Sequence, residues 1–127
     1  MGASGSAGLL LDTNILIDVL RGEERALHWL EGSGAGASIS VITWMEILVG
    51  CAAHESEPVE GWLRRFHRLD LDQARAAQAV QCRCRHGLRL PDAIILATAR
   101  RHGLRLASRN SRNFPESLGD VLLPYTL

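Results

Sequence analysis

The stretch LLLDTNILIDVL, residues 9–20, decides the fold class. It joins a short apolar run that ends in an acid to a second apolar segment, and a glycine turn follows. This order is typical of a buried strand, a capping turn at Asp12 and Thr13, and a short helix. A strand followed at once by a helix favours a sheet of parallel strands with helical connections.

The rest of the chain continues this alternation. Further strands are expected at residues 38–41, 69–71, 104–108 and 121–123. Helices are expected at residues 23–31, at 42–53, at 59–69, from 72 to about 86, and from Pro91 to Gly103. The helix at 42–53 is apolar nearly all round, so we expect it to be buried. We predict an α/β fold, a three-layer α/β/α domain with a central, mainly parallel sheet.

Length and composition indicate an ordinary globular domain of 127 residues with 46% hydrophobic and 22% charged residues. Residues 1–8 are small and rich in Gly and Ser, without the features of a signal peptide, and we interpret them as a flexible arm or a cloning remnant. Residues 9–127 are expected to form one domain. Its apolar runs are too short to span a bilayer. Cys51, Cys82 and Cys84 lack metal-ligand spacing and are expected to be reduced thiols, which favours a cytoplasmic protein.

The formal net charge of zero hides an uneven distribution. Residues 1–63 hold 2 Arg and 9 acidic residues, whereas residues 64–112 hold 12 Arg and 3 acidic residues. An arginine-rich region is typical of a surface that binds nucleic acid. Solvated helix faces explain the same charges without any function, so both interpretations stay open.

Three acids lie on apolar elements of the predicted fold: Asp12, Glu46 and Asp92. Asp12 ends a strand, and open α/β sheets bind ligands beyond the carboxyl ends of their strands. Simpler explanations exist for each acid: Asp12 caps a helix, Glu46 pairs with an arginine, and Asp92 interacts with a helix dipole. Together, however, the three supply the hard oxygen ligands that Mg²⁺ or Mn²⁺ requires. They predict a metal site.

Four segments, in this order, carry a recognisable pattern: LLDTN at 10–14, SVITWMEILVG at 40–50, LPDAIILATA at 90–99 and SRNSRNF at 108–114. They resemble the PIN-domain ribonucleases and, more narrowly, the VapC toxins of toxin-antitoxin pairs. The resemblance covers nearly the whole chain after residue 8. It implies a compact α/β/α domain whose acids gather at the carboxyl edge of a parallel sheet and bind Mg²⁺ or Mn²⁺.

The resemblance also implies site residues. Asp12, Glu46 and Asp92 match the three family acids, which act as metal ligands and catalytic residues. The fourth motif usually supplies another acid, but Asn113 stands in its place and removes one negative charge from the site. Glu46 is expected to position the attacking water or to ligate a second ion.

Residues around these acids complete the implied site. Thr13, Asn14, Ser108 and Asn110 are expected to hydrogen-bond to the carboxylates and fix their rotamers, and Arg109 and Arg112 are expected to hold the RNA backbone.

The implied function is a metal-dependent endoribonuclease toxin that a cognate VapB-like antitoxin neutralises. A homodimer and a larger toxin-antitoxin complex are expected, with no membrane partner. Two alternatives stay open: a degenerate PIN fold that binds RNA or protein without catalysis, and a DNA nuclease with the same acids.

Overall fold

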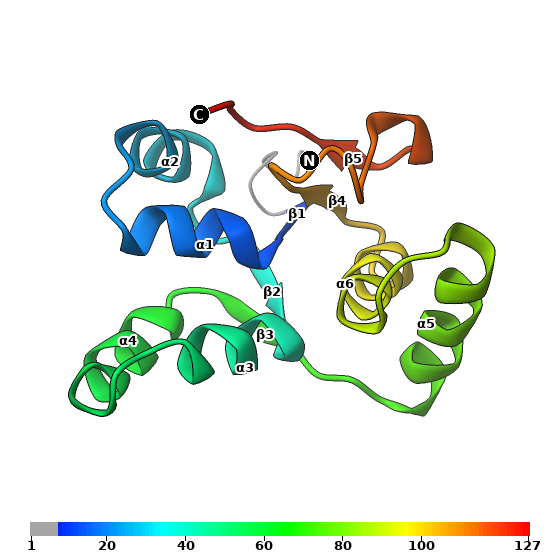
Figure 1. The fold of residues 1–127 in the computed structure, drawn as a ribbon, viewed down its shortest axis with the longest axis horizontal. Coiled ribbons are helices and arrows are strands. Elements are labelled where there is room, and N and C mark those ends of the chain that lie inside the picture. The colour runs from blue at the N-terminus through cyan, green and yellow to red at the C-terminus, as the bar shows by residue number, and fades with distance from the viewer. Residues whose placement is uncertain (1–7) are drawn as a thin grey trace.

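A five-stranded sheet forms the centre of the computed structural model, which describes residues 8–127 (Figure 1). Its strands are β1 (Leu9–Leu11), β2 (Ser38–Ser40), β3 (His67–Leu69), β4 (Arg105–Ala107) and β5 (Val121–Leu122). They pair in the order β3-β2-β1-β4-β5, and every pair is parallel. The chain builds the sheet outward from β1, first toward β3 and then toward β5. The switch of direction beside β1 is where such sheets bind ligands.

Helices connect the strands. They are α1 (Thr13–Leu20), α2 (Glu24–Trp29), α3 (Val41–Val49), α4 (Ser56–Leu63), α5 (Gln73–His86) and α6 (Leu90–Arg101). A π-helical turn (Leu30–Gly34) extends α2, and 3-10 turns lie at Ala53–Glu55 and Glu116–Leu118. None of the helices in residues 8–127 is long and apolar enough to cross a membrane.

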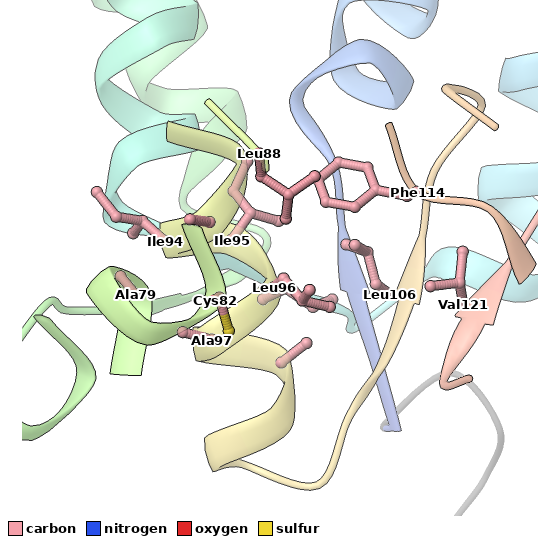
Figure 2. Packing of buried hydrophobic residues seen from close by; sticks show 13 residues of the cluster. Ala79, Cys82, Leu88, Ile94, Ile95, Leu96, Ala97, Leu106, Phe114 and Val121 are labelled. Carbon is pink, nitrogen blue, oxygen red and sulfur yellow. The ribbon is translucent and has the colours of Figure 1, made fainter. Parts of the chain in front are cut away.

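The two faces of the sheet carry separate apolar clusters, as the two-residue period of β1 requires. Leu10 packs on one face with α5 and α6, whereas Leu9 and Leu11 pack on the other with α1, α2 and α4. Figure 2 shows the first cluster, in which Phe114 lies beside Leu106. The predicted three-layer α/β/α fold with a parallel sheet is therefore confirmed.

Helix α6 is the most deeply buried helix of the described chain, with every residue from Asp92 to Ala99 buried. It packs between the sheet and α5 (Figure 1). Pro91 lies in its first turn, where a missing N–H removes no helical hydrogen bond. The predicted helix start is thus correct to within one residue, and it places Asp92 at a buried helix N-terminus.

Helix α3 differs from the prediction in length and in burial. It ends at Val49 rather than at residue 53, and only Thr43 and Ile47 are buried along it. Met45 is 47% exposed and Val49 85% exposed. The expectation of a buried helix was wrong because apolar residues all round a helix do not specify which faces other elements will cover.

The predicted helix at residues 59–69 was also wrong in its second half. Helix α4 ends at Leu63, and His67–Leu69 forms β3 instead. These residues pair with β2, where His67 lies opposite Ser38. Such pairing depends on a segment far away in the sequence, so a local pattern could not show it. Of the predicted arm at residues 1–8, all but Gly8 lies outside the described residues.

Candidate active site at the carboxyl edge of the sheet

Asp12 lies directly after β1 and is only 5% exposed. Its Oδ1 accepts a hydrogen bond from the backbone N–H of Thr13 (2.8 Å), and its Oδ2 accepts one from the Ser108 hydroxyl (2.6 Å). Asp12 is also the N-cap residue of α1. The capping interpretation and the site interpretation are therefore compatible, because one oxygen serves the helix and the other faces the loop after β4.

Asp92 is 6% exposed and lies at the same edge of the sheet. Its Oδ2 accepts hydrogen bonds from Asn113 Nδ2 (3.0 Å) and Arg89 Nε (3.2 Å). Asn113 occupies the place where the resemblance expects an acid. Here it acts as a donor to a carboxylate, which a second acid in its ionised form could not do.

The loop that follows β4 joins the two buried acids. Ser108 at its start bonds to Asp12, and Asn113 near its end bonds to Asp92. Asn110 holds the loop together, because its N–H donates to Ser108 Oγ (3.0 Å) and its Oδ1 accepts from the N–H of Asn113 (3.2 Å). The structure thus brings together five residues that the sequence singled out.

Glu46 reaches this edge from α3, but it is exposed. Its exposure follows from the partial burial of α3, where the sequence predicts a buried helix. Its Oε1 accepts a hydrogen bond from Thr13 Oγ1 (2.7 Å), and that hydroxyl also lies 2.9 Å from Thr43 Oγ1. Thr13, the residue that follows Asp12, therefore connects Glu46 to the start of α1.

Burial and the charges of Asp92 and Glu46 act on Asp12. The pKa of Asp12 is raised to about 6, mainly by burial, while the hydrogen bonds from Ser108 and Thr13 lower it. The negative charges of Asp92 and Glu46 raise it further. Asp12 is therefore poorly compensated as an anion, and a nearby cation would stabilise its ionised form.

The donor set fits Mg²⁺ or Mn²⁺, since both prefer carboxylate oxygens. Within residues 8–127, no three His, Cys, Asp or Glu side chains are arranged together as metal ligands. Ser108, Asn113 and Arg89 instead donate to the carboxylates of Asp12 and Asp92. The fit to Mg²⁺ or Mn²⁺ therefore rests on the carboxylate oxygens of the three acids and on the negative charge that Asp92 and Glu46 place near Asp12.

The remaining predicted residues lie around the loop. Asn14 Oδ1 accepts a long hydrogen bond of 3.4 Å from the backbone N–H of Arg109. The Arg109 guanidinium turns to Asp18, with Nε 2.6 Å from Oδ2 and Nη2 3.0 Å from Oδ1. Arg112 is exposed. Of the two predicted RNA contacts, Arg109 is thus already engaged within the protein.

Asp18 and Tyr125 are residues that sequence reasoning missed. Asp18 is 2% exposed, and besides Arg109 it accepts a hydrogen bond of 2.7 Å from the Tyr125 hydroxyl. Burial and this hydrogen bond raise the pKa of Tyr125 well above its usual range, and the bond to Asp18 raises that of Arg109. A signal was available, because Asp18 is a lone acid within an apolar helical segment, as Glu46 is.

An apolar hollow of roughly 360 Å³ opens beside Glu46, between α1, α3 and α4. Its lining combines apolar and charged side chains: Ile17, Leu20, Arg21, Glu46, Ile47, Gly50, Cys51, Glu55 and Val59. Leu20, which is 43% exposed, belongs to this lining, so the hollow offers apolar surface next to Glu46.

Comparison with known proteins identifies the family of the chain. The PIN domain family model matches residues 9–116, and the chain belongs to this family. No curated protein sequence matches it.

Among solved structures, a toxin-antitoxin complex from Klebsiella pneumoniae contains a chain that is 40% identical, with a TM-score of 0.88 over 94% of this chain and 99% of that one. FitAcB from Neisseria gonorrhoeae is 27% identical, with a TM-score of 0.67 over 91% and 97% of the two chains. DNA-bound VapBC from Salmonella typhimurium is 26% identical, with a TM-score of 0.71 over 84% and 89%. The resemblance to PIN-domain proteins of the VapC type is thereby confirmed.

Proposed function

We propose that this protein is a metal-dependent endoribonuclease that acts as the toxin of a toxin-antitoxin pair. One observation carries the proposal: two buried carboxylates, Asp12 and Asp92, lie at the carboxyl edge of the sheet and are joined by a single loop. Buried acids are costly unless they are compensated, so the presence of two at a ligand-binding edge favours a functional role. The toxin-antitoxin complexes among the similar structures support the biological class.

Asp12 and Asp92 would hold Mg²⁺ or Mn²⁺, which when bound lowers the pKa of a water molecule and offsets charge on the phosphate. Ser108 and Asn113 would keep the two carboxylates in fixed rotamers through the hydrogen bonds described above. Glu46 is exposed and tethered to Thr13, so it would orient the attacking water or ligate a second ion. Asn113 would contribute a neutral group where the resemblance expects an acid.

The substrate we propose is RNA. Arg112 is exposed on the loop that joins the two acids, so its guanidinium can reach a phosphate of a strand bound at the site. Arg109, the residue after Ser108, would add positive charge near the bound strand, although part of its guanidinium is bound to Asp18. Such backbone contacts give affinity that depends on salt and does not read the base sequence.

The partner we propose is a VapB-like antitoxin that covers the acidic edge. The apolar hollow between α1, α3 and α4 supports this, because it offers an exposed apolar surface directly beside Glu46. A homodimer within a larger toxin-antitoxin complex would complete the assembly. The three free cysteines, Cys51, Cys82 and Cys84, support a cytoplasmic location.

Cleavage of total cellular RNA by the purified protein tests the nuclease. We expect discrete cuts with Mn²⁺ or Mg²⁺ that disappear with a chelator and in the Asp12→Asn and Asp92→Asn variants. Glu31→Gln is the matched control, because Glu31 is an exposed acid on the turn after α2 and should leave cleavage unchanged. Single-stranded and duplex DNA in parallel reactions distinguish a DNA nuclease. Intact RNA under all conditions, with the antitoxin removed, would contradict the proposal.

A second candidate is a PIN fold that binds RNA or protein without cutting it. Asn113 favours this candidate, because it replaces an acid of the family pattern and engages Asp92 as a donor. Metal binding separates the two functions. An active site should be stabilised against unfolding by millimolar Mn²⁺, whereas a site that has lost metal affinity should show no shift.

A further inference from the structure

Asp18 forms a cluster that the proposed chemistry does not use. Its buried carboxylate accepts two hydrogen bonds from Arg109 and one from Tyr125. We call these three residues the Asp18 clamp. The three residues come from α1, from the loop after β4, and from the C-terminal segment after β5. A buried carboxylate with three donors is well compensated, so this cluster has one preferred geometry.

The C-terminal segment is held at two further points. Arg25 Nη1 donates to the backbone oxygen of Thr126 (2.6 Å), and the rings of Trp29 and Tyr125 lie 6.4 Å apart between centroids. Figure 1 shows this segment, in red, running from β5 back toward α2. The contacts that hold Tyr125 in position next to Asp18 therefore lie away from Asp12, Glu46 and Asp92.

The clamp ends next to the catalytic acids. Arg109 is the immediate neighbour of Ser108, whose hydroxyl donates to Asp12 (2.6 Å). The backbone N–H of Arg109 also donates to Asn14 Oδ1 (3.4 Å), close to the start of α1. Arg109 is thus held by its guanidinium and by its backbone N–H, which leaves little freedom for the preceding residue, Ser108.

We propose that Asp18 is a positioning residue of the active site, which fixes the start of the 108–113 loop through Arg109 so that Ser108 stays on Asp12, with Tyr125 completing the clamp. The role as a site rests on the proposed nuclease function. In this proposal the main role of Arg109 is to order the 108–113 loop, and contact with RNA is secondary.

Asp18→Asn in the full-length chain tests the clamp, with Tyr125→Phe as the milder variant. Asp72→Asn is the matched control, because Asp72, like Asp18, pairs with an arginine, but it does so with Arg75 on the exposed surface at the start of α5. Three measurements are made on each protein: amide hydrogen exchange of residues 108–113, the Kd for Mn²⁺ by titration calorimetry, and kcat and KM for RNA cleavage.

For Asp18→Asn we expect exchange in residues 108–113 to accelerate and the Kd for Mn²⁺ to rise about tenfold, the lower end of the effect of losing a direct partner of a metal ligand, because Asp18 acts on Asp12 only through Arg109 and Ser108. The kcat should fall, while KM and its dependence on salt stay as in the wild type. Tyr125→Phe removes a single hydroxyl and should raise the Kd about threefold. Asp72→Asn should change none of these values.

Unchanged exchange and unchanged Mn²⁺ affinity in Asp18→Asn would overturn the proposal. A raised KM with a weaker salt dependence, at constant kcat, would also overturn it, because that result assigns Arg109 to the RNA. If Asp18→Asn does not fold, Tyr125→Phe decides by the same measurements. If the wild type neither binds Mn²⁺ nor cuts RNA, the proposed function fails, and hydrogen exchange still decides whether the clamp orders the loop.

Discussion

Replacing Asp12 by Asn should make the metal-free protein more stable at neutral pH, although it removes a central acid of the site. Burial and the charges of Asp92 and Glu46 raise the pKa of Asp12 from 3.8 to about 6. At 1.36 kcal/mol per pKa unit, the ionised carboxylate costs about 3 kcal/mol of folding free energy above pH 7. Asn carries no charge and caps a helix as well as Asp does.

The full gain is an upper bound, because the amide can offer an oxygen to only one of the two present donors. The Ser108 hydroxyl can turn and accept from the new amide N–H, so most of the network survives. We expect Asp12→Asn to raise the free energy of unfolding by about 1–3 kcal/mol at pH 7.5. Urea unfolding with a chelator present measures this difference.

The pH dependence gives the second half of the test. Because the folded pKa of Asp12 lies above the unfolded value, its stabilising contribution is present below about pH 3.8 and is lost as the pH rises through about 6. Between pH 7.5 and pH 5 the wild type should therefore recover about 1.4 kcal/mol relative to the variant. Mn²⁺ should stabilise the wild type and leave Asp12→Asn unchanged.

Two results would refute this reasoning: a variant less stable than the wild type at pH 7.5, or a stability difference that does not change with pH. Asp72→Asn serves as the control. The backbone hydrogen bond from Arg75 lowers the pKa of Asp72, so neutralising this exposed acid should give no gain at pH 7.5.

Three further predictions address the loop, the core and the thiols. Asn113→Asp should lower metal-free stability by about 1–3 kcal/mol, because Asp92 loses a donor and gains a like charge, and should tighten Mn²⁺ binding; urea unfolding and calorimetry measure the two effects. Phe114→Ala should cost about 3–5 kcal/mol in urea unfolding, because Phe114 is 1% exposed in the cluster of Figure 2, and a cost below 1 kcal/mol would contradict that packing. Exposed Cys84 should react with a thiol reagent much faster than buried Cys82 in the folded protein, and the two rates should converge in urea.

The sequence by itself determined the class of fold and the positions of the two buried acids. Two local signals did this: the apolar run that ends at Asp12, and the proline before Asp92. Each depends only on residues close in sequence, so the first predicts the end of a strand and the second the start of a helix without knowledge of the tertiary structure. The resemblance also placed Asn113 among the expected site residues, and in the structure its side-chain amide donates to Asp92.

Only the tertiary structure decided which faces are covered and which distant groups meet. Glu46 is exposed because no element within residues 8–127 covers its side of α3, and β3 exists because residues 67–69 pair with β2. The Asp18 clamp joins Asp18 to residues 91 and 107 positions further along the chain. Hydrophobic period and capping are local properties of a sequence, whereas burial and the pairing of charges depend on neighbours that only the folded chain supplies.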